Sequence, residues 1–380
     1  MSKIKILFFG KLPPPFNGEN IVSSSILNLL NDHCEITIIN SSENIEKKLG
    51  YFNKSLYYFK QSFNLLRVFF KVSNTVKKEK FDFLYFSGSS SSAGSFSDFI
   101  LVKLARKHVG KIVCHLHNSQ FSYRFTAFPT KYTAPFIAKH VDKFIFLSHI
   151  LSENLKDHIP QYKRVVSSNP ISKELIVTDE QFERKQALKS KDDSFIITYL
   201  SNFILSKGYM ELVEALELLP QAVKSKINVR FIGSWMDDKT KEQEFLKKIS
   251  QPDLSGIVEY VGPVYDRIKL KSYLLQSDIF CLPTYYPLEA QPVSIIEAMN
   301  AGNAIISTWH ASIPEYVESG KDGYLISKHD INALAEAITK LCDRQALNSF
   351  SDNVRDKFKT RFNEESILNG LLQIFSRPIN

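Results

Sequence analysis

The sequence predicts an α/β protein made of two Rossmann-like halves, each with a parallel sheet covered by helices. Three observations support this. The chain has 380 residues, which suits two domains better than one core. Short, almost continuously apolar runs alternate with amphipathic stretches, as expected for parallel strands that are buried on both faces. The alternation breaks once, near Asn169-Pro170, and then restarts.

In the first half, the apolar runs predict strands at 4–9, 35–40, 81–86, 111–116 and 143–148. Helical patterns separate them, at 19–31, about 53–79, 96–108, 132–140 and 149–157. This repeated order of strand and helix predicts a doubly wound domain, because parallel strands need a crossover that packs on the sheet.

In the second half, a polar segment at 173–194 is expected to be a linker with one helical turn. Strands are then predicted at 195–200, 227–233, 256–262, 278–283, 303–308 and 323–327. Helices are predicted near 207–219, 238–250, 266–276, 293–301, 330–342 and 363–376. We therefore expect an N-terminal domain of residues 1–172 and a C-terminal domain of residues 173–362, with the helix in 363–380 packing back onto the first domain.

Composition narrows the class of protein further. Apolar residues make up 44% and charged residues 23%, which excludes collagen-like, coiled-coil and disordered chains. No apolar stretch is long enough to span a membrane, and the start reads as a buried first strand and not as a signal peptide. The four cysteines are far apart and show no zinc-ligand spacing, so we expect a reducing cytoplasm. The aspartate pairs at 192–193 and 237–238 lack DxD spacing, so no metal site is predicted.

Positive charge is concentrated in the first half. Residues 1–170 hold 23 lysines and arginines against 11 acidic residues, whereas the remainder holds 25 against 29. Within 47–81, nine basic residues and nine aromatic residues accompany a single acidic residue. Such a stretch favours an anionic membrane surface, with contacts expected from Lys47, Lys48, Lys54, Lys60, Arg67, Lys71, Lys77 and Lys78. The alternative is a long surface helix whose aromatic stripe lies in the core; nucleic acid is disfavoured because no reader motif accompanies the charge.

The most informative stretch is PTYYPLEAQPVSIIEAMNAGNAIIST, residues 283–308. Glu289 lies in a loop after an apolar strand, and Glu297 lies within the helix that follows. Pro292 and Gly302 are start and stop signals for that helix. The first-turn amides of a helix can bind an anion such as a diphosphate, and two carboxylates can accept hydrogen bonds from sugar hydroxyls. Taken as two isolated residues, the glutamates would more simply be surface charges.

Two other loops could bind phosphate. Lys207 lies between a strand and a helix, where its ammonium group could neutralise a diphosphate. The loop GKLPPPFNGEN, residues 10–20, keeps Gly18 at a position from which backbone amides could reach a phosphate. It contains neither the GxGxxG dinucleotide motif nor a Walker motif.

Residues 283–308 resemble the E-x7-E signature of the retaining family 4 glycosyltransferases, which have the GT-B fold. The residues in register are Glu289, Pro292, Glu297, Ala298, Met299 and Gly302, while Ala290 and Gln291 depart from the usual Gly or Ser and Phe. Residues 199–216 resemble the family's G-R-(L/F)-x-x-x-K-G segment through Lys207 and Gly208. Asn202 replaces the arginine of that segment, which puts one charge partner of the diphosphate in doubt.

The resemblance implies a GT-B fold of two Rossmann-like domains that face each other across a cleft for donor and acceptor. Lys207, the amino end of the 293–301 helix and the Gly18 loop would hold the diphosphate of a nucleotide sugar. Glu297 would bind the ribose, and Glu289 would bind the sugar together with His117, in the strand-end sequence HLHN. Further donor contacts are implied at Asn202, Val264, Ala290, Gln291, Pro292 and Val293. Neither a cofactor nor a metal is implied.

The expected function is therefore glycosyl transfer with retention, with UDP-sugar favoured as the donor that is commoner in the family. The expected acceptor is a glycan, lipid-linked through a polyprenyl diphosphate, in bacterial O-antigen or capsule assembly. This acceptor would place a cytoplasmic enzyme peripherally on the inner face of the membrane. Three alternatives stay open: a non-catalytic sugar- or lipid-binding GT-B subunit, which the missing arginine motivates, a GT-B nucleotide-sugar epimerase, and a Rossmann oxidoreductase, which the missing GxGxxG disfavours.

Overall fold

The computed structural model describes residues 3–14, 18–41, 54–89, 91–190 and 192–376, with side chains in the 54–78 helix described from Asn64 onward. The chain divides into two compact units. The first comprises Met1–Ser168 and Ile367–Asn380, and the second comprises Asn169–Ser366. Within the described residues, each unit holds one six-stranded sheet in which all strands are parallel. Among these residues, no helix combines the length and the apolar character that crossing a bilayer requires.

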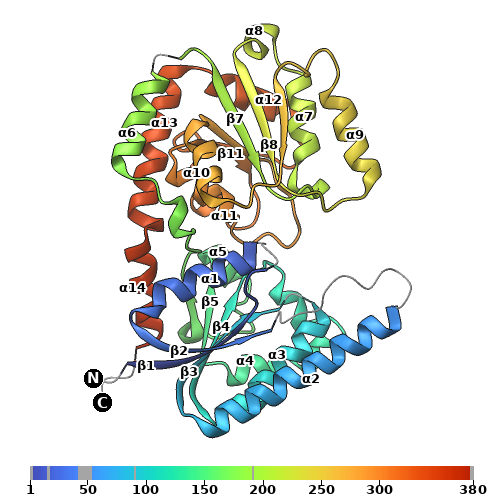
Figure 1. Cartoon of the computed structure of the whole chain (residues 1–380), viewed down its shortest axis with the longest axis vertical. Coiled ribbons are helices and arrows are strands. Elements are labelled where there is room, and N and C mark those ends of the chain that lie inside the picture. The colour runs from blue at the N-terminus through green and yellow to red at the C-terminus, as the bar shows by residue number, and fades with distance from the viewer. Residues whose placement is uncertain (1–2, 15–17, 42–53, 90, 191, 377–380) are drawn as a thin grey trace. The chain divides into compact units, whose positions relative to one another are not determined.

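The sheet of the first unit has the strand order β2-β1-β3-β4-β5-β6. In Figure 1, helix α1 lies on one side of this sheet, and α2, α3 and α4 lie on the other. The strands are β1 (Ile4–Gly10), β2 (Cys34–Asn40), β3 (Phe81–Gly88), β4 (Val109–Leu116), β5 (Lys143–Phe146) and β6 (Arg164–Val166). The α-helices are α1 (Gly18–Asn31), α2 (Lys54–Lys78), α3 (Ser92–Ala105), α4 (Ala134–His140) and α5 (His149–Glu153). Short helical turns are η1 (Phe121–Phe125), η2 (Thr130–Tyr132) and η3 (Gln161–Lys163).

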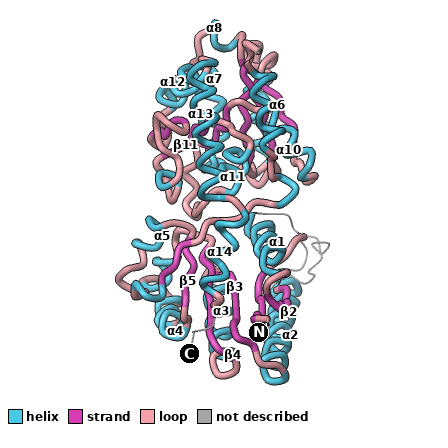
Figure 2. The backbone as a smooth tube through the Cα atoms, turned by 90° about the vertical axis from the view of Figure 1, so that its left-hand side faces the viewer, coloured by secondary structure: helices cyan, strands magenta, loops and turns pink. Residues whose placement is uncertain are grey.

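The sheet of the second unit has the order β12-β11-β10-β7-β8-β9. Figure 2 looks onto the face that α6, α10, α11 and α13 cover, while α7, α9 and α12 cover the other. The strands are β7 (Phe195–Leu200), β8 (Ile227–Ile232), β9 (Val258–Gly262), β10 (Ile279–Leu282), β11 (Ala304–Thr308) and β12 (Gly323–Ile326). The α-helices are α6 (Asp179–Lys189), α7 (Tyr209–Glu217), α8 (Gln221–Lys224), α9 (Lys239–Ile249), α10 (Arg267–Gln276), α11 (Val293–Asn300), α12 (Ile331–Leu341) and α13 (Arg344–Lys357). Short turns are η4 (Lys173–Leu175), η5 (Leu205–Lys207), η6 (Ile313–Glu315) and the π-helical η7 (Phe358–Phe362).

The end of the chain belongs to the first unit. Helix α14 (Glu364–Ile374) leads to Phe375, which is fully buried. The Phe375 ring lies 5.3 Å from the Phe83 ring and 6.0 Å from the Tyr85 ring, measured between centroids. Both partners lie on strand β3, so Phe375 completes the core of that sheet.

The expectation of a linker at 173–194 is wrong, because residues 179–189 form helix α6. The helix starts with a capping box, in which Thr178 and Gln181 satisfy each other's backbone amides. Its buried positions include two lysines, and Lys185 Nζ donates to Ala301 O (2.7 Å) and to Asn303 Oδ1 (2.6 Å). A helix whose buried positions carry lysines shows no apolar periodicity, which is why the sequence pattern concealed it.

Among the described strands and α-helices, α8, α13 and β6 were also not predicted. Helix α13 carries Leu347, Phe350 and Val354 at helical spacing on its buried side, so its signal is present in the sequence. Strand β6 has three half-buried residues and lies at the edge of its sheet, so its sequence carries little strand signal.

Candidate functional site

The candidate site is built around the loop between β10 and α11, at the carboxyl edge of the second sheet. This is where ligands bind in open parallel sheets. Two hydrogen bonds fix the start of the loop. Tyr285 N donates to Ser206 O (2.8 Å), and Thr308 Oγ1 donates to Thr284 O. The loop is thereby fixed to the segment that follows β7 and to the last residue of β11.

Glu289 of this loop forms an ion pair with Lys207, the last residue of η5. Lys207 Nζ lies 2.5 Å from Glu289 Oε2, and the two side chains are only 14% and 8% exposed. Thr284 Oγ1 donates a second hydrogen bond to the same carboxylate oxygen (3.2 Å). The Lys207 ammonium group also lies 4.7 Å from the centre of the Tyr286 ring. The structure thus brings together two residues that are 82 positions apart.

Gly208 makes this placement of Lys207 possible. Its φ of +82° lies in the left-handed region, and a Cβ there would approach Pro283 O to 2.3 Å. Any other residue would push the turn away from the end of β10. A glycine after Lys207 is therefore needed for the turn that brings the lysine to the loop.

Glu297 is the second buried carboxylate, and it lies in α11. The Glu297 side chain is 6% exposed and pairs with the guanidinium group of Arg267. Arg267 is the first residue of α10, and its side chain is 20% exposed. Sequence reasoning did not single out Arg267. A contact between residues 30 positions apart leaves no periodic pattern in the sequence.

The amino end of α11 lies between the two carboxylates in sequence. Pro292 is its N-cap, and no side chain caps the helix. The positive end of the helix dipole is thus left for an anion. Ala290 and Gln291 are buried and Val293 is half-buried. The Gln291 side chain accepts from Asn169 N (2.7 Å), so it also braces the start of the second unit.

The other donor-binding candidates of this unit lie at the same edge of the sheet. Asn202 follows β7 and is exposed, and Val264 follows β9 and packs partly against the core. No hydrogen bond described for the unit joins either of them to Lys207 or Glu289. They share the carboxyl edge with the ion pair, and their donor contacts stay predictions.

His310 is a further residue that sequence reasoning missed. It follows β11, and its Nε2 donates to Tyr286 O (2.8 Å). Burial lowers the pKa of His310, and the charges of Glu289 and Lys207 also act on it. An imidazole that is neutral near pH 7 therefore holds the loop that carries Glu289. A lone histidine after a strand carries no sequence signal for this role.

In the first unit, the HLHN sequence ends β4. His115 is fully buried, and its Nδ1 lies 2.6 Å from Tyr85 Oη. Burial lowers the pKa of His115 well below its usual value. His117 is half-buried just past the strand, with its ring 4.1 Å from that of His115. Gly18 is exposed at the start of α1, and the preceding residues 15–17 lie outside the described part of the chain.

Helix α2 has a buried apolar side, as the core reading of the basic, aromatic stretch predicted, while its contact with a membrane stays a prediction. Val68, Phe69, Val72 and Val76 are buried, whereas Leu66 and Phe70 are each 69% exposed. The exposed surface also carries the predicted basic residues Arg67, Lys71, Lys77 and Lys78. Lys47 and Lys48 lie outside the described residues, and Lys54 and Lys60 lie in α2 where side chains are not described.

Among the described residues, no group of three or more His, Cys, Asp or Glu side chains could hold a metal ion. Cys34, Cys114 and Cys281 are buried in strands, and the cysteines are unbridged. The candidate site consists of the uncapped amino end of α11, one lysine and two carboxylates. Such a set can bind a diphosphate and hydroxyl groups.

Comparison with known proteins identifies the second unit. Residues 180–360 match the model of the family described as "Glycosyl transferases group 1". These residues form a glycosyl transferases group 1 domain. The matched range contains Lys207, Arg267, Glu289 and Glu297, so the candidate site lies within the glycosyltransferase domain.

Relatives agree with this identification. One relative is the colanic acid biosynthesis glycosyltransferase WcaL of Salmonella typhimurium. It is 33% identical over 170 residues, which are 42% of this chain and 40% of the relative. The amylovoran biosynthesis glycosyltransferase AmsK of Erwinia amylovora is 31% identical over 141 residues, 36% of this chain and 34% of the relative. The match thus spans about two fifths or less of the length of these relatives.

The fold resembles that of Anabaena HepE in complex with UDP, with a TM-score of 0.72, 18% identity and coverage of 98% of this chain and 99% of that one. Sucrose-phosphate synthase of Thermosynechococcus elongatus gives a TM-score of 0.73, with 16% identity and 98% coverage of both chains. The chain has the GT-B fold of two Rossmann-like domains, as its sequence predicted.

Proposed function

We propose that this protein is a retaining glycosyltransferase that moves a sugar from a nucleotide diphosphate donor, most simply a UDP-sugar, to a glycan acceptor. The observation that carries the proposal is the Lys207–Glu289 pair in the loop that leads to the uncapped amino end of α11. The pair holds a cation and a hydroxyl acceptor in place before a donor arrives. This reduces the ordering that binding would otherwise require.

When the donor binds, each carboxylate exchanges a cation for hydroxyl groups. Lys207 leaves Glu289 for the diphosphate, which frees the carboxylate to accept from a hydroxyl of the sugar. Glu297 likewise leaves Arg267 and accepts from the ribose diol. The helix end of α11 binds the diphosphate together with Lys207. Each buried carboxylate keeps a partner in both states, which avoids the cost of an unpaired buried charge.

In the transfer step, the acceptor hydroxyl attacks the anomeric carbon on the same face as the leaving diphosphate. The bond from that carbon to the acceptor oxygen forms as its bond to the diphosphate oxygen breaks. The acceptor proton goes to the leaving phosphate oxygen. Lys207 stabilises the negative charge that develops there, and no metal or cofactor is part of this proposal. His117, on the first unit, is proposed to bind the transferred sugar.

The donor assignment is tested by thermal unfolding of the protein with UDP, GDP, ADP, CMP and their common sugar conjugates. A ligand that binds only the folded state raises the melting temperature. We expect a shift with one nucleotide family, and UDP is favoured because HepE was solved with UDP. No shift with any nucleotide would overturn the proposed transfer and favour a non-catalytic subunit.

For the acceptor, we propose a lipid-linked glycan of bacterial surface polysaccharide assembly. The names of the relatives support this. They include a capsular polysaccharide biosynthesis glycosyltransferase of Staphylococcus aureus and an N-acetylgalactosaminyltransferase of Campylobacter jejuni whose name contains a diphospho-undecaprenol substrate. Exposed apolar and basic residues on α2 would place the first unit peripherally on an anionic membrane at the cytoplasmic face.

The membrane contact is tested by flotation with phosphatidylglycerol vesicles. The double variant Arg67→Glu and Lys78→Glu should lose binding, because each exposed basic residue near an anionic surface contributes about 1 kcal/mol and reversal adds repulsion. The matched control reverses Lys239 and Lys247, two exposed lysines of α9. Equal flotation of both variants would remove the membrane proposal.

A further inference from the structure

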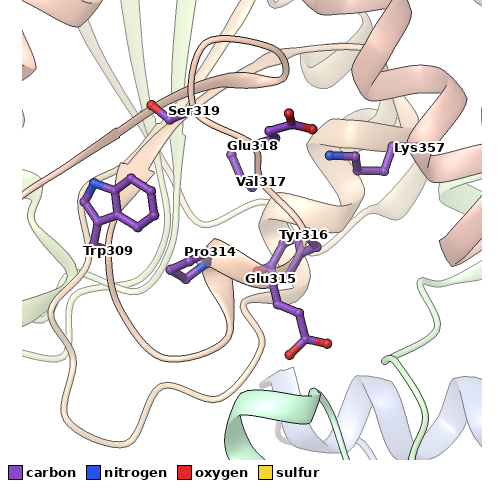
Figure 3. A pocket seen from close by; sticks show the side chains of 8 residues that line it. All are labelled: Trp309, Pro314, Glu315, Tyr316, Val317, Glu318, Ser319 and Lys357. Carbon is purple, nitrogen blue, oxygen red and sulfur yellow. The ribbon is translucent and has the colours of Figure 1, made fainter.

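A hollow of about 360 Å³ lies in the second unit, beside the segment that follows β11. Eight residues line it: Trp309, Pro314, Glu315, Tyr316, Val317, Glu318, Ser319 and Lys357. In Figure 3, Trp309 and Lys357 lie on opposite sides, with Pro314 and the two glutamates between them. The volume is at the lower end of the range of about 300–1,000 Å³ for small-molecule sites. None of the donor-site residues described above lines this hollow.

Trp309 gives the hollow an apolar wall that is left in water. The side chain is 55% exposed, although tryptophan is highly buried on average. The other tryptophan of the sequence, Trp235, packs among aromatic rings and lies 4.4 Å from Phe203. The backbone of Trp309 is fixed, because its N–H donates to Ile326 O (3.0 Å). The exposed indole thus offers a flat apolar face to a ligand.

The charged groups of the hollow are already matched within the protein. Lys357 pairs with the buried Asp322, Glu315 pairs with Arg361 (3.0 Å), and Glu318 pairs with Lys321 (3.4 Å). A charged ligand would have to break one of these pairs. The carboxylate oxygens can still accept hydrogen bonds from neutral hydroxyl groups. An apolar plane with acceptors beside it suits a sugar ring, which has a C–H face and hydroxyls at its edge.

The same segment also supports the donor loop. His310 Nε2 donates to Tyr286 O (2.8 Å), and Ser312 N donates to Ala290 O (3.3 Å). The wall of the hollow and the support of the Glu289 loop therefore come from one continuous stretch, residues 309–319. A ligand on Trp309 would be bound by the stretch that fixes the loop of the transfer site.

We infer that this hollow is a subsite for a neutral sugar unit of the acceptor glycan, stacked on Trp309 and hydrogen-bonded by Glu315 and Glu318. The inference rests on the proposed glycosyltransferase function. It adds a binding site for a part of the acceptor that does not react. It also assigns the second unit a share in recognising the acceptor.

The test is saturation-transfer NMR on the full chain, with the methyl glycosides of glucose, galactose, mannose and N-acetylglucosamine as probes and with UDP present. At least one glycoside should receive saturation on its ring protons from the wild-type protein. Trp309→Ala should lose the signal, and Trp309→Phe should retain part of it because an aromatic face remains. The control Tyr162→Ala removes an aromatic side chain of the first unit that is 69% exposed, and it should leave the signal unchanged.

A nucleotide measurement separates failure of this inference from failure of the proposed function. Trp309→Ala should keep the UDP-induced rise in melting temperature, which also shows that the variant is folded. The subsite is overturned if no glycoside binds the wild type, if Trp309→Ala binds as well as the wild type, or if that variant loses UDP binding as well. If the wild type binds a glycoside through Trp309 but binds no nucleotide, the hollow stays a sugar site and the transferase proposal fails.

Discussion

Replacing Glu297 by alanine should weaken nucleotide binding through loss of the ribose hydroxyl contacts. A hydrogen bond to a charged group contributes about 1.5–3 kcal/mol, and a diol makes two of them. The wild type, however, must break the Glu297–Arg267 ion pair when the nucleotide binds. This pair contributes less free energy than the two hydrogen bonds, because the Arg267 side chain is 20% exposed. We expect a net loss of about 2–3 kcal/mol, which is about 30–150-fold in the Kd for UDP.

The assay is isothermal titration calorimetry with UDP and with 2′-deoxy-UDP. The wild type should bind 2′-deoxy-UDP about 10–30-fold more weakly, because one of the two hydroxyl contacts, each about 1.5–2 kcal/mol, is gone. Glu297→Ala should bind both nucleotides equally. This comparison isolates the hydroxyl contact from any general effect of the substitution.

The variant should also lose some stability, because Arg267 is left without its carboxylate. Since the guanidinium reaches solvent, we expect about 1–2 kcal/mol, seen as a fall of a few degrees in Tm. The matched control is Glu259→Ala, which breaks the exposed Arg230–Glu259 pair (3.5 Å) in the same unit and should leave UDP binding unchanged. If Glu297→Ala still discriminated between the two nucleotides as the wild type does, the assignment of Glu297 to the ribose would be refuted.

Three other substitutions test the remaining parts of the site and its support. Glu289→Gln should leave the Kd for UDP within about 2-fold and lower kcat by about 10²–10³, because it removes a charged contact to the reacting sugar; an unchanged kcat would contradict this. Lys207→Met should weaken the binding of UDP more than the binding of uridine in calorimetry, because Lys207 is proposed to contact the diphosphate. Equal weakening of both would contradict that contact. Burial lowers the pKa of Lys185 to about 7, whereas an unfolded lysine titrates near 10.5. The unfolded chain therefore binds more protons between these values, and the free energy of unfolding should rise with pH by about 1–3 kcal/mol between pH 7 and 9. Lys185→Met should flatten that rise in urea titrations, and an identical slope in both proteins would contradict the assignment.

The sequence determined the fold class and the location of the donor loop. Buried parallel strands need near-continuous apolar runs, so the strands other than the three-residue β6 were visible as such runs. The spacing of Glu289 and Glu297 around Pro292 was by itself enough to place one carboxylate in the loop and the other in the helix. Gly208 beside Lys207 was equally visible in the sequence, although its reason, the close approach to Pro283 O, was not.

Only the tertiary structure decided the partners of these residues. Three polar contacts join segments that are far apart in the chain: Arg267 with Glu297, His310 with Tyr286, and Lys185 with Ala301. Such contacts depend on how the crossovers bring strand ends together, and they impose no period on the sequence. The hollow beside Trp309 arises in the same way, because a strand end, a turn and the last residue of α13 enclose it. Apolar periodicity is a local property and can be recognised in the sequence. Single polar side chains from distant segments come together only when the sheet has formed.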